Sequence, residues 1–379
     1  MEKKTSSVYL DYAAAEPPIP SVKEYVRSGV EMYFNPSSIY QRGRYAWQLI
    51  EAVREKIAKT INADPEEIIF TSGCSESNAL AITGSRDNNT VDYVVATEIE
   101  HSSILESPYL YQAKIAVDEK GFVDQDHLEK MCRELRGDTL FCIQHANNEI
   151  GAIQKVEGLS KIIHDNKHLL LVDAAQTFGK LPIDVKKMNI DFLSASAGKC
   201  GGIRGAGFLY VRKGLNISPV IFGTQESHRR GGTYNDLAIV AFGKAIDGFD
   251  FRKQTVIRSK RNYLIEELLK LKGIALVGKR ADRLPNNVFI TIKDLDIDSQ
   301  QLVSLLDMYG FMVSAGSACH AGESQISHVL KALGYDEESA KTCLRVSIGE
   351  ETTIQELNLF IESLKVIMKM HKIKREKND

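Results

Sequence analysis

Short β-rich runs alternate with helical patterns between residues 68 and 212, and this alternation limits the possible folds more than any other feature of the sequence. The runs expected as strands are 68–70, 93–96, 140–143, 169–172, 192–194 and 208–211. Before them, Leu49, Val53 and Ile57 recur at the four-residue spacing of a helix that faces a core. Such alternation is typical of βα units around a mainly parallel sheet, so we predict a large α/β domain.

The pattern changes after about residue 252. A charged helical stretch over 258–272 is followed by an apolar run, 287–292, and then by a terminal helix in which Ile354, Leu357 and Ile361 recur at a spacing of three to four. A smaller α+β domain is therefore expected to close the chain.

Composition and charge exclude several classes of protein. The 379 residues include 48 basic and 50 acidic side chains, a formal net charge of −2, so no net field recruits nucleic acid or an anionic membrane surface. No apolar stretch approaches the roughly 20 residues of a spanning helix, and no secretory signal follows Met1. Six cysteines without a C-x-x-C pair indicate neither a disulfide framework nor a zinc site. We expect a cytoplasmic protein with reduced thiols and no metal.

The segment 71–77, Thr-Ser-Gly-Cys-Ser-Glu-Ser, follows a predicted strand and opens a predicted helix. Free backbone N–H groups and the Ser75 hydroxyl would then meet at the positive end of a helix dipole, a geometry that holds phosphate. The segment matches no nucleotide-binding loop. Taken alone, the segment is weak evidence, because a Ser at a helix start such as Ser75 is more often an ordinary helix cap.

An acid and a lysine follow two successive predicted strands. Asp173 ends one strand, and the next runs out through Ser196 to Lys199. Ligands of open α/β sheets bind at such strand ends. Pyridoxal 5'-phosphate (PLP) chemistry needs a lysine for covalent attachment, an acid for the pyridine nitrogen and a phosphate cradle. Each residue taken alone has a simpler explanation, Lys199 as a surface lysine and Asp173 as a turn residue.

Two further strand ends carry polar side chains. His101 lies just past the strand that ends at Ala96, and Asn148 lies in the segment 144–151 after the next strand. Both would reach a ligand bound at the same edge. A lone histidine is usually structural, however, and an Asn-Asn pair usually makes a turn.

The small domain supplies two candidates. Cys319 lies in the small-residue loop 314–322, which would leave a nucleophilic thiol accessible; the alternative is a buried, inert cysteine. Arg345 lies in the short apolar strand 343–347, where its guanidinium could clamp a substrate carboxylate, or could instead form a structural ion pair.

Taken in order, these segments resemble the cysteine desulfurases (NifS-like) of the class V aminotransferase family, PLP enzymes of fold type I. The resemblance covers nearly the whole chain. It rests on Leu10–Ala14, Asn35–Ser38, Phe70–Gly73, Glu100–His101, Asn147–Gly151, Val172–Gln176, Lys199, Gly232–Thr233, Gly316–Cys319 and Leu344–Ser347.

The resemblance implies a fold and a set of roles. The large domain, residues 15–252, would hold a mainly parallel seven-stranded sheet, and residues 1–14 and 253–379 would form the small domain. Lys199 would carry PLP, with Asp173 on its pyridinium nitrogen and His101 stacked over the ring as an acid or base. The remaining cofactor contacts implied are Gln176 and Asn148 near the ring hydroxyl, Cys74, Ser75 and Ser196 at the phosphate, and Thr233 at the phosphate of a partner subunit in a homodimer.

The activity implied is conversion of L-cysteine to L-alanine. Lys199 would move the α-proton, Arg345 and Asn148 would bind the substrate, and Cys319 would keep the sulfur as a persulfide for a sulfur-acceptor protein. Two alternatives stay open. A selenocysteine lyase or another PLP β-lyase would not need Cys319. A PLP-binding scaffold without turnover is suggested by Gly198, which stands where the family usually has a histidine.

Overall fold

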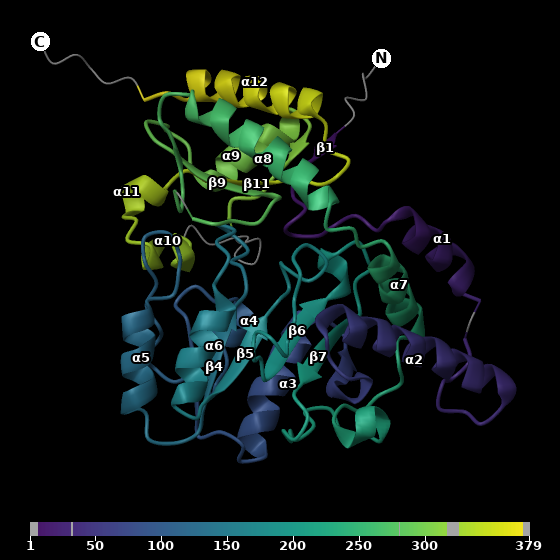
Figure 1. Ribbon diagram of the computed structural model, residues 1–379. Coiled ribbons are helices and arrows are strands. Elements are labelled where there is room, and N and C mark those ends of the chain that lie inside the picture. The colour runs from purple at the N-terminus through teal and green to yellow at the C-terminus, as the bar shows by residue number, and fades with distance from the viewer. Residues whose placement is uncertain (1–6, 32, 280, 317–325, 374–379) are drawn as a thin grey trace, which may run out of the picture.

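A mixed sheet forms the centre of the larger part of the chain in this computed structural model, which describes residues 7–31, 33–279, 281–316 and 326–373. Figure 1 shows the smaller part, with α12, above this sheet and its helices. The strands of the sheet, in spatial order, are β2 (Ile68–Thr71), β7 (Gly207–Val211), β6 (Phe192–Ser196), β5 (Leu169–Asp173), β4 (Thr139–Gln144) and β3 (Tyr93–Ala96).

Every run that the sequence pattern predicts as a strand is one, and the sheet is mainly parallel. β3, β4, β5 and β6 pair in parallel, and β7 pairs antiparallel with both β6 and β2. The described residues place six strands in this sheet rather than the seven expected from the resemblance. Beyond β3, residues 110–115 make only isolated bridges, through Tyr111 N–H to Val94 O (2.7 Å) and Ile115 N–H to Ala96 O (2.9 Å). That edge segment is therefore too irregular to count as a strand.

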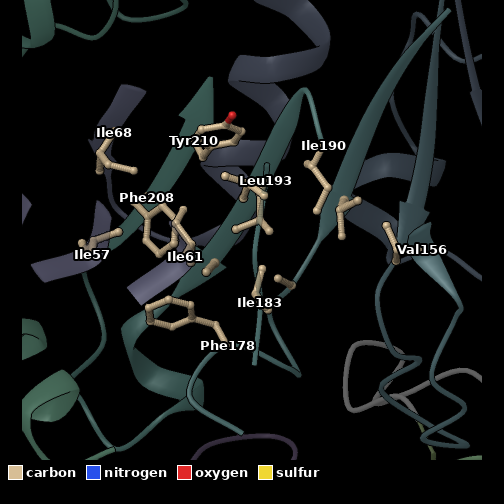
Figure 2. Close-up of a cluster of buried hydrophobic side chains, with 14 of the residues drawn as sticks. Ile57, Ile61, Ile68, Val156, Phe178, Ile183, Ile190, Leu193, Phe208 and Tyr210 are labelled. Atoms are coloured by element: carbon tan, nitrogen blue, oxygen red, sulfur yellow. The ribbon is translucent and has the colours of Figure 1, made fainter. Parts of the chain in front are cut away.

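Helices cover both faces of the sheet because its strands are buried on both sides. One face packs against α2 (Gln41–Ile61), α5 (Gln125–Glu134), α6 (Val156–Asp165) and α7 (Asp236–Asp247). The other packs against α3 (Cys74–Asp87) and α4 (Ser102–Leu105). Within one strand, Phe141 faces the first core and its neighbour Cys142 the second, as the two-residue period requires. Figure 2 shows how Ile57 and Ile61 of α2 meet Phe208 of β7 in the first core.

The smaller part is an antiparallel sheet covered by helices. Its sheet has the order β11 (Cys343–Ser347), β9 (Asn287–Ile292) and β8 (Ile274–Leu276), and a parallel pair joins β1 (Val8–Tyr9) to β10 (Phe311–Met312). The covering helices are α8 (Lys253–Leu269), α9 (Ser299–Met308) and α12 (Ile354–Met370). Leu10 shares their hydrophobic core, so we propose the domain division 15–252 against 1–14 plus 253–379.

The remaining elements are short. They are α1 (Pro20–Gly29), α10 (His328–Ala332), α11 (Glu337–Ala340) and the 3₁₀ turns η1 (Pro65–Glu67), η2 (Ala197–Lys199) and η3 (Gln225–His228). In the described ranges, no helix is both long and apolar enough to cross a bilayer.

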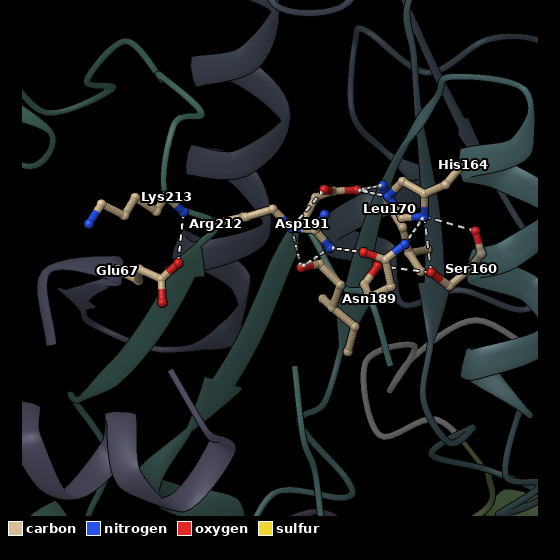
Figure 3. Close-up of polar contacts among 9 residues, drawn as sticks. Glu67, Ser160, His164, Leu170, Asn189, Asp191, Arg212 and Lys213 are labelled. Atoms are coloured by element: carbon tan, nitrogen blue, oxygen red, sulfur yellow. Dashed lines mark hydrogen bonds and ion pairs between the residues drawn. The ribbon is translucent and has the colours of Figure 1, made fainter. Parts of the chain in front are cut away.

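A buried carboxylate ties together the edge of the sheet where β5 and β6 begin. Asp191, just before β6, accepts hydrogen bonds from Leu170 N–H (2.8 Å) and pairs with His164 Nε2 (2.8 Å) and Arg212 Nε (3.2 Å), as Figure 3 shows. The hydrogen bond to Asp191 raises the pKa of His164 above its ordinary value. These contacts link α6, β5, β6 and the end of β7.

The raised pKa of His164 predicts a pH dependence of stability. The stabilisation is fully present below the unfolded-state pKa of His, about 6.5, and is lost as the pH rises through the higher folded-state pKa. We expect His164→Gln to lower the free energy of unfolding by about 1–2 kcal/mol at pH 6 and by much less at pH 9. Urea unfolding at both pH values checks this, and identical losses at the two pH values would contradict it.

Candidate active site

Four of the residues singled out from the sequence come together at one edge of the large sheet. Asp173 ends β5, Lys199 follows β6, and His101 and Asn148 follow β3 and β4. Because these strands are parallel and adjacent, their carboxyl ends share one edge. β2 also ends there, since it pairs with β7 through Thr71 and Gly207. The turn before α3 therefore opens onto the same edge.

Three donors hold the carboxylate of Asp173. Asn78 Nδ2 donates to Oδ2 (2.9 Å), and the Ala175 N–H (2.8 Å) and the Cys74 thiol (3.3 Å) donate to Oδ1. The residue is only 7% exposed. Burying a carboxylate without such partners would be costly. The arrangement therefore presents a fixed negative charge at the end of β5.

The Cys74 thiol serves Asp173 rather than a phosphate. Burial, followed by the charge of Asp173, raises the pKa of Cys74 well above its ordinary value, so the thiol stays protonated and acts as a donor. Its sulfur also contacts Ser194 Oγ at 3.2 Å. The expectation that Cys74 holds phosphate stays a prediction, and with the thiol engaged by Asp173 it concerns the backbone N–H.

The turn before α3 has the shape of an anion cradle. Ser75 is exposed in the first turn of α3, and Ser196 Oγ lies 3.8 Å from the position that a Cβ on Gly73 would take. A Cβ on Gly207 would lie 2.5 Å from the Gly73 Cα, so only glycine lets β7 begin this close. The Ser196 hydroxyl thus lies near Gly73, beside the N-terminus of α3, where backbone N–H groups can bind an anion.

The Lys199 amine reaches back to the N-terminal segment. Its Nζ donates to the carbonyls of Ala13 (3.0 Å) and Ala14 (2.6 Å). Gln176 Nε2 donates to the same Ala13 oxygen (3.0 Å), while its Oε1 is buried with no hydrogen-bond partner in the part of the chain that the structure describes. A buried acceptor left open beside Lys199 fits a ligand hydroxyl.

The His101 imidazole is held in one orientation and is neutral. Its Nδ1 accepts the Ser103 N–H (3.1 Å) and contacts the Ser103 hydroxyl (2.9 Å). Burial lowers the pKa of His101, so the neutral form predominates at neutral pH. A neutral imidazole can stack over a ring or accept a proton.

Arg345 forms a structural ion pair, which is one of the two roles left open for it, and its role toward a substrate carboxylate stays a prediction. Its Nη2 pairs with Asp11 Oδ1 (2.8 Å), and its Nη1 donates to the Asn148 carbonyl (2.9 Å). The residue is 2% exposed, and its Nε has no hydrogen-bond partner among the described residues. The ion pair thus orients the guanidinium and leaves one buried donor open.

One predicted residue, Thr233, is not brought into this cluster: it is exposed, in the segment after Gly231. Cys319 lies outside the described residues. Gly198 does border the cluster. A Cβ there would lie 3.4 Å from the Arg204 Cγ, so the side chain of Arg204 covers the space that a larger residue would use. Among the described residues, no group of three or more His, Cys, Asp or Glu side chains is arranged to hold a metal.

Sequence reasoning missed Asn78 and Asp11. Asn78 is fully buried, holds Asp173 and also donates to the Ser103 hydroxyl (3.0 Å). Its position one helical turn after Cys74 is the signal that could have found it, because residues four apart lie on one helix face. Asp11 has no comparable signal, since its partner Arg345 is 334 residues away.

With this geometry in place, known proteins can be compared. A model of the family described as "Aminotransferase class-V" matches residues 8–360. "Cysteine desulfurase IscS" of Dictyoglomus turgidum is 38% identical, with 98% of this chain and 97% of that protein aligned. "Cysteine desulfurase IscS 1" of Archaeoglobus fulgidus is 37% identical, with 94% and 95% aligned. The NifS-like protein of Rickettsia africae superposes with a TM-score of 0.88 at 32% identity, covering 96% of this chain and 99% of that one.

The chain therefore belongs to the class V aminotransferase family, and its fold is that of the NifS-like enzymes. Enzymes of this family and its cysteine desulfurases depend on PLP. The residues of this chain fit that group: a held carboxylate, a lysine amine, an open buried acceptor and the glycine-containing turn at the N-terminus of α3 lie at one sheet edge.

Glu100, which precedes His101, predicts a second pH dependence. Burial raises its pKa to about 8, while Oε1 accepts hydrogen bonds from the Thr97 hydroxyl (2.6 Å) and Gln144 N–H (2.8 Å). Because ionisation is disfavoured only in the folded state, stability falls as the pH rises from the unfolded-state pKa toward 8.

We expect Glu100→Gln to remove most of this loss, a gain of about 2–4 kcal/mol at pH 8 and little at pH 5. Urea unfolding of both proteins across this pH range is the check. The idea is wrong if the variant is destabilised equally at every pH.

Proposed function

We propose that this protein is a PLP-dependent cysteine desulfurase that converts L-cysteine to L-alanine and leaves a persulfide on Cys319. The observation that carries the proposal is the meeting of Asp173, Lys199 and His101 at one sheet edge beside the buried donor of Arg345. The cysteine desulfurases aligned over nearly the whole chain support the same activity.

The residues that would hold PLP are those of the cluster. Lys199 would bind it covalently, Asp173 would pair with its ring nitrogen, and Gln176 Oε1 and Asn148 would lie near its hydroxyl. Ser75, Ser196 and the start of α3 would hold the phosphate. PLP, when bound, supplies an electron sink for carbanion chemistry at the amino acid.

Proton movement falls to two side chains. The Lys199 amine would take the α-proton of cysteine. Two protons then return to carbon, one to the β-carbon, which becomes the methyl group of alanine, and one to the α-carbon; the α-proton supplies one of them and the substrate thiol the other. His101 is neutral at neutral pH and held by Ser103, so it can accept a proton without first losing one to solvent and can then return it.

Substrate orientation falls to Arg345. Its guanidinium is fixed by Asp11 and by the Asn148 carbonyl, and the open Nε donor can bind the carboxylate of an amino acid. A charge-assisted bond in a buried site also orients the substrate for proton transfer.

Sulfur transfer needs a reactive thiol, and the described cysteines do not supply one. Burial raises the pKa of every one of them, which leaves their thiols protonated: Cys74, Cys132, Cys142, Cys200 and Cys343. We therefore assign the nucleophile to Cys319. Its thiolate attacks the substrate sulfur, the S–S bond forms as the carbon–sulfur bond breaks, and the carbon takes a proton. Cysteine and thiol thus become alanine and persulfide.

The proposed partners are L-cysteine, a second copy of the chain and a sulfur-acceptor protein, as in iron–sulfur cluster assembly. An exposed apolar patch, with Phe222 84% exposed, lies beside the segment of Thr233, because Gly231 N–H donates to Ile221 O (2.7 Å). A second copy covering this patch would bring Thr233 to the phosphate of the neighbouring site. The cytoplasmic location stays a prediction.

Turnover of L-cysteine tests the activity. With a reductant present, the purified protein should release alanine and sulfide in equal amounts, and mass spectrometry after cysteine treatment without reductant should find one added sulfur on Cys319. Lys199→Ala should abolish both products because nothing remains to attach the cofactor or move the α-proton.

Cys319→Ala is the informative comparison. It should abolish alanine release from cysteine, since no thiol remains to take the sulfur. Full activity on selenocysteine in this variant would instead identify a selenocysteine lyase. No alanine from the wild-type protein loaded with PLP would leave the non-turnover scaffold.

A mixed dimer tests the shared site. Loss of the Thr233 hydroxyl should weaken PLP binding about 10- to 150-fold, the value of a hydrogen bond to a charged group. At a PLP concentration where Thr233→Ala homodimers are largely empty, a mixed dimer of Thr233→Ala and Lys199→Ala chains should recover about half the wild-type activity, because one of its two sites is intact. A mixed dimer as inactive as both parents would place Thr233 in its own subunit's site.

A further inference from the structure

Glu149 is a buried carboxylate that none of the steps above uses. It follows Asn148 in the loop after β4 and is 0% exposed, and its backbone N–H donates to Asn147 Oδ1 (2.9 Å). A carboxylate placed so deep is costly unless it has partners. The next residue, Ile150, and Phe289 belong to the hydrophobic cluster that joins the two domains.

The same oxygen of Glu149 meets both flanks of segment 317–325, which contains Cys319. On the far flank, the Ser327 hydroxyl donates to Glu149 Oε2 at 2.6 Å. On the near flank, a Cβ on Gly316 would lie 3.2 Å from Oε2, and Gly316 has a φ of +108°. Only glycine combines that backbone conformation with so close an approach. One side chain of the large domain thus accepts a hydrogen bond from the far flank and lies close against the glycine backbone of the near flank.

Neighbouring contacts tie the same flanks to the active site. His328, the residue after Ser327, contacts the Glu100 carbonyl through Nε2 (3.0 Å), and Glu100 precedes His101. Ser314 exchanges backbone hydrogen bonds with Arg345 (2.7 and 3.2 Å). Each flank is therefore anchored close to a residue assigned to cofactor or substrate.

We propose that Glu149 is a positioning residue for sulfur transfer: it fixes both flanks of segment 317–325 against the large domain and so sets where Cys319 meets the substrate. The proposal rests on the proposed function of Cys319. An apolar residue at position 149 would cost less in desolvation. However, it could not accept the hydrogen bond of the Ser327 hydroxyl beside the Gly316 backbone. The role lies in the step that forms the persulfide, and binding of cysteine does not depend on it.

The test separates binding from sulfur transfer in the holoenzyme. Cysteine affinity is measured by spectral titration of the bound cofactor, and persulfide formation on Cys319 by mass spectrometry in a single turnover. Glu149→Ala and Ser327→Ala should each slow persulfide formation at least tenfold, with cysteine affinity changed less than twofold. The double variant should be no slower than Glu149→Ala, because the two groups act through one contact. Ser327→Thr, which keeps the hydroxyl, should restore the rate.

A matched control accounts for the loss of a helix cap. Ser327 also caps α10 by accepting Val329 N–H (3.1 Å), and Asp336 caps α11 in the same way by accepting Ser339 N–H (2.7 Å). Asp336→Ala should leave persulfide formation unchanged. If it slows the reaction as much as Ser327→Ala does, or if cysteine affinity and persulfide formation fall together, Glu149 has only a structural role.

A readout without turnover keeps this result apart from a failure of the proposed function. The rate at which iodoacetamide alkylates Cys319 should rise at least fivefold in Glu149→Ala and in Ser327→Ala and stay unchanged in Asp336→Ala. Unchanged alkylation in the two variants would overturn the positioning role even if the wild-type protein forms a persulfide. A wild-type protein without persulfide but with these alkylation changes would overturn only the activity.

Discussion

The carboxylate of Asp173 is the group on which the rest of the site depends. It stands at the end of a buried parallel strand, where an unpaired charge would be costly. Two donors from α3 and one from the turn after β5 hold it. Those donors also determine where α3 must lie, because Asn78 and Cys74 are on one face of that helix. Holding the charge thus places the start of α3, and with it the cradle at Gly73.

A second buried carboxylate, Asp191, lies at the opposite edge of the sheet and has different partners. Asp191 is also buried, and its carboxylate is paired with two basic side chains of the chain, His164 and Arg212. Asp173 has no cation among the partners described, only neutral donors. A carboxylate held by neutral donors keeps its charge available to a cationic group such as a protonated ring nitrogen. This difference separates a stabilising carboxylate from one suited to binding.

The sequence predicts the strands well because each is a short apolar run, and it predicts Asp173, Lys199 and His101 because parallel strands end at one edge. It could not predict which partners hold them. Asn78 meets Asp173 across 95 residues, and Arg345 meets Asp11 across 334, so both contacts depend on sheet register and domain docking. The seventh strand, expected from the resemblance, does not form in the described residues, because residues 110–115 make only isolated bridges to β3.

Apolar and polar groups make different contributions to the contact between the two domains. Ile150 and Phe289 bury apolar surface, which holds the domains together but has little directional preference. Direction comes from the buried polar contacts that cross the same interface, from Arg345 to the Asn148 carbonyl and from Ser327 to Glu149. Both end on adjacent residues of one loop. The orientation of Arg345 and of Ser327 relative to the large domain is therefore set at a single short segment after β4, residues 148 and 149.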